Sequence, residues 1–245
     1  MAHESAAESL ARACEEVPDT ALRVSFVRHQ LGALPQVDAV DVLALAFRSA
    51  ELGDHRARQL VAAAAMALAP STALSLRASL ADAAYRRGHR DLARLLTREE
   101  RDHEPDATRV PDHGTGRPLS LGERKSLARR RDRHLLTRVL TDPHPDVIRL
   151  LLGNPMIIET DIIRLAARRP AHPEICREIA GSPRWMVRYP VQLTLVKNPG
   201  TPRDVALPLV ALLRRPDLNE IAGLPDLSHA VQQAATRALS RPLLA

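Results

Sequence analysis

Aromatic residues are scarce in this sequence, which has two phenylalanines, two tyrosines and one tryptophan among 245 residues. Hydrophobic residues still make up 45% of the chain, and most of them are alanine, leucine, valine and isoleucine. Small aliphatic side chains suit helices that pack closely, whereas sheets favour aromatic and β-branched residues. The composition therefore predicts an all-α protein.

Cysteine is nearly absent too, since the chain has only Cys14 and Cys176. A disulfide between them is one alternative, but a cytosolic chain more often keeps such residues as small buried side chains. No uncharged apolar stretch approaches about 18 residues, so the sequence predicts no membrane span. The first residues, MAHESAAESLARACEE, are acidic where a secretory signal needs a basic start. We expect a cytoplasmic protein.

Motifs for catalysis, nucleotide binding and metal binding are also missing. The ten histidines have no metal-ligand spacing. The sequence contains no Walker loop, no G-x-S-x-G and no G-x-G-x-x-G. We therefore expect no catalytic residue, no metal, no cofactor and no small-molecule substrate, and a protein that is not an enzyme.

Positive charge, by contrast, is abundant and unevenly distributed. Of the 35 basic residues, all except Lys125 and Lys197 are arginines. Residues 1–103 carry 13 basic and 14 acidic side chains, whereas residues 121–245 carry 20 and 12, a net charge of +8. The positive excess of the chain thus belongs to its C-terminal half.

The pattern along the chain predicts an N-terminal helical domain over residues 1–103, either a bundle or an array of helical hairpins. The expected N-caps are Asp19 or Thr20, Asp38, Asp54, and Ser71 or Thr72. Gly53 and Gly88 are expected to close helices in the left-handed conformation. Hydrophobic periodicity predicts helices over 20–34, 38–52, 55–69, 72–87 and 89–100.

Residues 104–119 are predicted to be a flexible linker, because they are rich in proline and glycine and poor in apolar residues. Ser120 and Glu123 then form an S-x-x-E capping box that starts a new helix. Residues 120–245 form the second predicted domain. The sequence leaves open whether the two domains pack together.

Proline dipeptides recur in this second domain with a nearly constant period of 40 to 46 residues. We expect each Asn-Pro to end one helix and start the next, with asparagine as the N-cap. The period is that of HEAT or armadillo units and predicts a right-handed α-solenoid. The recurring dipeptides are Asp142-Pro143, Ser182-Pro183 and Leu224-Pro225, then Asn154-Pro155 and Asn198-Pro199, and the helix-closing Arg169-Pro170 and Arg215-Pro216.

Two segments, DPHPDVIRLLLGNP and SPRWMVRYPVQLTLVKNPGTP, carry a more specific resemblance. Together with the helices that follow them, they resemble the leucine-rich repeat variant family over residues 134–240. The resemblance implies a superhelical array of short helices and no particular activity. The best-known member of that family holds an iron–sulfur cluster on an N-terminal group of cysteines; this chain has no such group, so we do not expect that cofactor.

Three groups of residues are candidates for binding a partner. The first lies in ERKSLARRRDRHLLTR, where a single helix would bury its leucines and expose a cationic face. The second is a predicted ladder of paired arginines before Pro170 and Pro216, and the third surrounds Trp185. The candidates are Arg124, Lys125, Arg129, Arg130, Arg131, Arg133, Arg168, Arg169, Arg184, Trp185, Arg188, Tyr189, Arg214 and Arg215.

Each group also has a purely structural interpretation. The cationic face can be a solvated surface, and the paired arginines can cap the last carbonyls of their helices. Trp185 can fill the core between repeats. The leading functional hypothesis is a scaffold or adaptor that binds the acidic surface of another protein.

Two other functions stay open at this stage. The first is nucleic-acid binding, which is favoured if the arginines converge on one surface and disfavoured if they scatter. The second is an enzyme similar to the helical-repeat DNA glycosylases, for which five aromatic residues are few.

Overall fold

The computed structural model describes residues 2–68, 73–97 and 116–240. Within these ranges the chain is helical and contains no strand, so the predicted all-α class is confirmed. No helix in these ranges is both long and apolar enough to cross a membrane. Cys14 and Cys176 are free thiols, and both are buried.

The N-terminal helices pack into one group, with α3 against α1, α4 and α5, and α2 against α4. Leu31, Leu43 and Leu60 are fully buried among them. The first helix, α1, is an addition to the helices that the sequence predicts. The helices are α1 (Ala2–Glu16), α2 (Thr20–Ala33), α3 (Gln36–Glu51), α4 (His55–Ala67), α5 (Leu74–Arg86) and α6 (Arg90–Leu96).

The ends of these helices follow local chemistry. Asp19 accepts a hydrogen bond from the Leu22 amide at 2.8 Å, so it is the N-cap of α2. Asp54 caps α4 in the same way. The prediction for Asp38 is wrong, because α3 begins at Gln36 and Asp38 lies inside its first turn. Ser71 and Thr72 lie outside the described residues. Gly53 and Gly88 have φ angles of 105° and 79°, which are left-handed as predicted.

The second helical region begins after the predicted linker, most of which (104–115) lies outside the described residues. Residues 116–119 are not helical. The capping box of Ser120 and Glu123 is confirmed. The helices that follow are α7 (Leu121–Ala128), α8 (Arg133–Val139), α9 (Pro145–Leu152), α10 (Glu159–Ala166), α11 (Pro173–Ala180), α12 (Pro183–Met186), α13 (Tyr189–Lys197), α14 (Arg203–Val210), α15 (Arg215–Gly223) and α16 (His229–Ser240).

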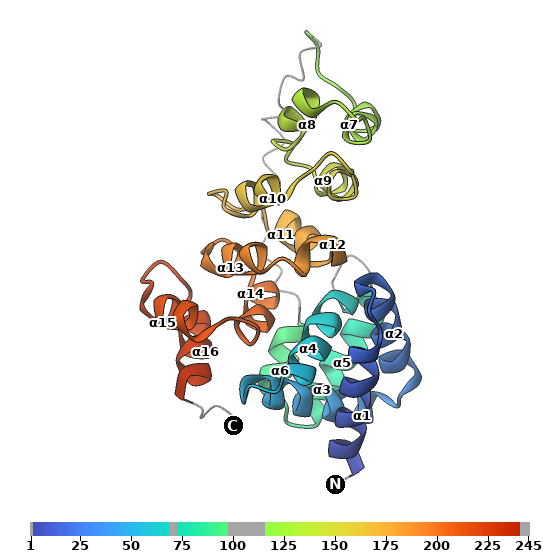
Figure 1. Cartoon of the computed structure of the whole chain (residues 1–245), viewed down its shortest axis with the longest axis vertical. Helices are drawn as coiled ribbons and strands as arrows, with labels where there is room; N and C mark the ends of the chain where they lie inside the picture. The colour runs from blue at the N-terminus through green and yellow to red at the C-terminus, as the bar shows by residue number, and fades with distance from the viewer. Residues whose placement is uncertain (1, 69–72, 98–115, 241–245) are drawn as a thin grey trace.

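Successive helices of this region pack in two rows. One row has α9 between α7 and α11, and the other has α13 between α10 and α15. The apolar side of α9 is buried through Val147, Ile148 and Leu151. In Figure 1 these helices form an arm that runs from α7 and α8 at the top to α15 and α16 at the lower left.

Asn154 links neighbouring turns rather than capping a helix. Its Nδ2 donates to the carbonyls of Ala128 and Arg130, both at 2.8 Å, and its Oδ1 accepts from the Met156 amide. The predicted N-cap role is wrong, because α10 begins only at Glu159. The side chain instead satisfies backbone groups of the turn between α7 and α8.

Asn198 makes the equivalent contacts further along the chain. Its Nδ2 donates to the carbonyls of Ala166 and Arg168, at 2.8 and 2.7 Å, and its Oδ1 accepts from the Gly200 amide. The two Asn-Pro dipeptides therefore mark the same local structure. Pro216, which was expected to close a helix, lies in the first turn of α15 instead.

The two helical regions are in contact with each other. Helix α14 packs against α4 and α6, and α12 packs against α2 and α4. Figure 1 shows the N-terminal group at the lower right, beside the lower part of the arm. The sequence leaves open whether the two helical regions pack together, and the structure shows that they do.

Candidate partner-binding surface

A buried ionic cluster lies where the two helical regions meet. Asp204, at the start of α14, accepts hydrogen bonds from Nε and Nη2 of Arg177, both at 3.0 Å. Its Oδ2 also lies 3.3 Å from Nη2 of Arg77, which belongs to α5 in the N-terminal group. Arg77 further donates to the carbonyls of Leu68 and Leu95. One carboxylate therefore ties both regions together.

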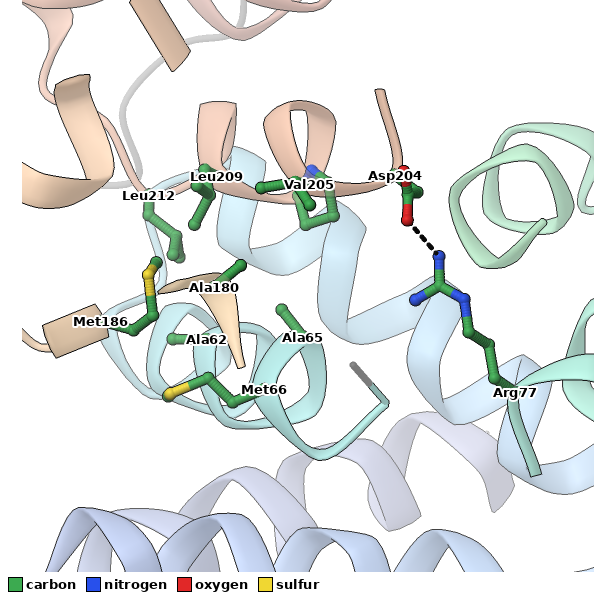
Figure 2. A pocket seen from close by; sticks show the side chains of 11 residues that line it. Ala62, Ala65, Met66, Arg77, Ala180, Met186, Asp204, Val205, Leu209 and Leu212 are labelled. Carbon is green, nitrogen blue, oxygen red and sulfur yellow. Dashed lines mark hydrogen bonds and ion pairs between the residues drawn. The ribbon is translucent and has the colours of Figure 1, made fainter. Parts of the chain in front are cut away.

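The junction around this cluster is closely packed. Figure 2 shows Asp204 and Arg77 beside an apolar cavity lined by Met66, Met186 and Leu209, among others. The cavity measures about 30 Å³, which has room for no more than a water molecule or two. The junction is therefore a structural interface rather than a binding surface.

The predicted cationic helix is in fact two helices, α7 and α8, separated by a turn at residues 129–132. Asp132 caps α8 through the His134 amide, which ends the continuity. The charged side chains therefore do not share one helix face. They divide instead into a paired group and an exposed group.

The paired group is held by carboxylates of the same region. Arg124 is buried, and its Nη1 lies 2.7 Å from Asp142, which is completely buried. Lys125 lies 2.6 Å from Asp146. The third member, Arg133, makes two bonds to Asp161. These three cations contribute to the fold rather than to an exposed binding face.

The contact of Arg133 with Asp161 has the two-pronged geometry of a strong ion pair. Nη1 and Nη2 of Arg133 lie 2.5 and 2.7 Å from the two carboxylate oxygens. Burial alone would raise the pKa of Asp161, but hydrogen bonds from Arg133 and from the Ile158 amide outweigh it and lower that pKa. Asp161 thus stays charged near neutral pH.

The exposed group is Arg129, Arg130 and Arg131, which we call the arginine turn. All three side chains are exposed. Among the described residues, none of them has a side-chain hydrogen bond or ion pair. The arginine turn therefore presents three guanidinium groups that the fold itself leaves unused.

A set of segments in contact with one another runs along the arm from the arginine turn. It comprises the α7–α8 and α9–α10 turns, α12 with the start of α13, and the α14–α15 turn, and we call it the first turn series. The turn between α9 and α10 touches the arginine turn through Asn154. Helix α12 touches that same α9–α10 turn through Arg184. The turn between α14 and α15 touches the start of α13 through Arg214, whose amide donates to the Tyr189 hydroxyl.

Trp185 belongs to the core within this series. Its side chain is 4% exposed, and its indole Nε1 donates to the Leu152 carbonyl at 2.8 Å. Arg184 covers the indole, 4.4 Å from the ring centroid, and donates to the carbonyls of Asn154 and Ile157. The core-filling interpretation thus fits Trp185, while Arg184 forms an exposed lid over it.

Tyr189 lies in a different helix from Trp185, so the two aromatic rings do not share a helix face as predicted. The Tyr189 hydroxyl bonds to Asp217, and Arg214 stacks 4.5 Å from the ring centroid. Arg188 is exposed and lies 3.9 Å from Glu159. The arginines of these turns are thus exposed along the same series as the arginine turn.

Arg168 and Arg169 belong to another set of touching turns, the second turn series. The turn between α10 and α11, which contains both, contacts the α13–α14 turn through Asn198. Arg169 also donates to the Lys197 carbonyl and lies 3.8 Å from Asp226 in the turn between α15 and α16. The predicted ladder is therefore split, with Arg168 and Arg169 in this series and Arg214 in the first.

The two arginines of each predicted pair also make different contacts. Arg169 and Arg215 each donate to a carbonyl in the last turn of another helix, those of Lys197 and Leu239. This resembles the capping interpretation, except that the capped helix is not their own. Arg168 is half-buried, and desolvation lowers its pKa.

Sequence reasoning missed two features of the site region. The first is Arg177, whose carboxylate partner lies 27 positions away and gives no local signal. The second is an open cleft of about 460 Å³ between the two helical regions, bounded by α3, α6, α14 and α16. Within the described ranges, no group of histidine, cysteine and carboxylate side chains could hold a metal ion.

Comparisons with known proteins add no assignment to this geometry. The chain matches no protein-family model, no curated protein and no solved structure. The resemblance to the leucine-rich repeat variant family therefore stays a prediction from the segments quoted above. The binding surface rests on contacts, burial and charge alone.

Proposed function

We propose that this chain is a cytoplasmic scaffold or adaptor that binds an acidic segment of another protein through the first turn series. The observation that supports this most directly is the arginine turn, with three exposed guanidinium groups that have no partner among the described residues. Guanidinium groups bind carboxylates in a two-pronged geometry, so carboxylate side chains are the natural complement.

The remainder of the series supports the same proposal. Arg184 and Arg214 are exposed and stacked on aromatic rings, which fixes their planes and lowers the entropy lost on binding. Arg188 is exposed beside them. An acidic segment laid along these turns would meet cations from α7 to α15.

We further propose that residues 121–240 form a short right-handed α-solenoid of the HEAT-like or leucine-rich repeat variant type. Two rows of packed helices and the matching hydrogen bonds of Asn154 and Asn198 support this. A solenoid suits a scaffold because it offers an extended surface. We do not assign it an enzymatic activity.

Nucleic acid is the alternative partner. A phosphate backbone would be tracked best by one uninterrupted row of cations. Arg124 is buried, and Arg168 and Arg169 lie in the second turn series, so the candidate arginines do not make one row. This division favours an acidic protein over a duplex.

The experiment is affinity purification of the tagged full-length chain from its native cytoplasm, with and without nuclease. The wild type is compared with a variant of the arginine turn, Arg129→Glu, Arg130→Glu and Arg131→Glu together. We expect a discrete protein to be retained after nuclease treatment and to be lost with the variant.

The matched control changes the same charge elsewhere. Arg12, Arg138 and Arg164 are exposed and lie on α1, α8 and α10, outside the first turn series. Changing these three to glutamate should leave the partner bound. Equal loss in both variants would mean that net charge alone is responsible, and retention of nucleic acid that nuclease removes would replace the proposal with its alternative.

A further inference from the structure

The cleft between α3, α6, α14 and α16 has the size of a ligand pocket rather than a packing defect. Its volume is about 460 Å³, whereas the junction cavity beside Asp204 measures about 30 Å³. Small-molecule sites in proteins generally span about 300 to 1,000 Å³. Both helical regions contribute walls, so the cleft exists only because the two regions pack together.

Apolar side chains form much of the cleft wall. Phe47 of α3 and Leu92 and Leu95 of α6 face it from the N-terminal group. Leu207 of α14 faces it from the C-terminal region. An apolar body entering the cleft would therefore leave water, with a gain of about 25 cal/mol per Å² of buried apolar area.

Helix α16 leaves part of the cleft open because three of the residues it contributes there are alanines. Ala230, Ala234 and Ala238 repeat every four residues and all line the cleft. All three are partly exposed, although alanine is small enough to be buried without cost. A larger residue at Ala234 would close the space.

Cations surround this apolar wall. Among the side chains that the structure describes, Arg48 of α3, Arg90 of α6 and Arg237 of α16 line the cleft together with a single carboxylate, Glu51. Arg48 and Arg90 are exposed, and in the part of the chain that the structure describes their side chains have no hydrogen bond or ion pair. The charge around the cleft therefore complements an anion.

His89 also lines the cleft, but its ring is already engaged. Its Nε2 lies 2.9 Å from Asp41, which also binds Arg87. Since the hydrogen bonds from Arg87 and His89 outweigh burial, the pKa of Asp41 is lowered and the carboxylate stays charged. An incoming anion would thus be bound by the arginines rather than by the histidine.

We propose that this cleft binds a small amphipathic carboxylate, with an acyl or similar apolar body against α6 and α14 and its carboxylate between Arg48 and Arg90. The volume lies in the range of small-molecule sites, and an apolar wall bordered by a few cations matches a small molecule with one anionic end.

Isothermal titration of the full chain with decanoate tests the proposal, and 1-decanol serves as the uncharged probe of equal chain length. We expect decanoate to bind more tightly than decanol. The variant Arg48→Glu with Arg90→Glu should weaken decanoate binding by about tenfold or more, because two attractive charges become repulsive. Its affinity for decanol should change little.

Two further variants distinguish the effect of the cleft arginines from the effect of the cleft volume. Arg12→Glu with Arg138→Glu makes the same charge change outside the cleft and should leave decanoate affinity within about twofold. Ala234→Trp should fill the cleft and abolish binding of both probes. If circular dichroism shows that this variant is unfolded, the arginine variants still decide the result.

Three outcomes would overturn the proposal. The first is no binding of decanoate at millimolar concentration. The second is equal affinity for decanol, which would remove the role of Arg48 and Arg90. The third is loss of the captured acidic protein in the cleft variants without any decanoate binding, which would assign the cleft to a protein partner. The arginine-turn variant tests the scaffold separately, since it does not touch the cleft.

Discussion

At the scale of single residues, ion pairs with nearby carboxylates determine which arginines are available to bind a partner. Asp142 binds Arg124 and Asp161 binds Arg133, so neither cation is available to a partner. Among the residues that the structure describes, no carboxylate pairs with the arginine turn. Burying an ion pair brings little net stability, but removing one member leaves a charge buried without its counter-ion.

Arg124 and Arg131 should therefore respond very differently to truncation. Arg124→Ala leaves Asp142 buried without its arginine and is expected to lower the free energy of unfolding by about 3 kcal/mol. Arg131→Ala, at an exposed position, should change it by less than about 0.5 kcal/mol. Urea denaturation followed by circular dichroism measures both, and equal losses would contradict the distinction.

Whether a side-chain contact can be predicted depends on how far apart its two residues lie in the sequence. Caps such as Asp19 and Asp54 act within three residues and were predicted correctly. The partners of Arg124 and Arg133 lie 18 and 28 positions away, and the sequence gives no sign of which arginine meets which carboxylate. The sequence analysis predicts one helix for Trp185 and Tyr189, whereas Pro190, in the first turn of α13, marks the start of a separate helix.

At the scale of elements, short helices are joined by turns that depend on asparagine side chains. Asn198 donates to two carbonyls of another turn and accepts from an amide of its own. The Asn-Pro spacing predicted a repeat but not these bonds, because periodicity locates a turn without giving its partner. The arm is thus stabilised through its turns as well as through apolar helix faces.

Asn198→Ala removes these bonds and should cost about 2 kcal/mol of unfolding free energy, since buried carbonyls lose their donors. Asn198→Asp keeps the acceptor but loses the donor, so it should be destabilised to a similar extent. The control is Asn219→Ala on the exposed side of α15, with little expected effect. Tolerance of Asn198→Asp would show that donation is unimportant.

Acid should weaken the same region. The lowered pKa of Asp161 means that its stabilising contribution is present above the ordinary carboxyl pKa of 3.8 and is lost as the pH falls below it. We expect the thermal unfolding midpoint to fall as the pH is lowered from about 5 to about 3. The variant Asp161→Asn should be less stable at neutral pH and less sensitive to acid; an unchanged slope would contradict this assignment.

At the scale of the whole molecule, the junction of the two helical regions could not be predicted. Arg77 and Asp204 are 127 positions apart, and each occurs in a segment that is ordinary for an amphipathic helix. Composition and periodicity predicted two helical regions, but their packing depends on complementary surfaces. The cleft was missed for the same reason, since neither region forms it alone.

Arg77→Met should loosen this junction without removing its bulk. Trp185 is the only tryptophan and lies in the C-terminal region, so its fluorescence reports that region, whereas circular dichroism reports both. In the wild type we expect the two denaturation curves to coincide. In the variant they should separate; the exposed substitution Arg86→Met is the control and should leave them coincident.

The position of Asp204 also bears on how such a chain can be rearranged. Asp161 has its arginine within the arm, whereas Asp204 binds Arg177 of the arm through both oxygens and shares Oδ2 with Arg77 of the N-terminal group. A gene fusion that carried only residues 121–240 would keep one of these two arginines and would uncover the side of α14 that packs on α4 and α6. We therefore expect recombination to transfer the two helical regions together, as one heritable unit.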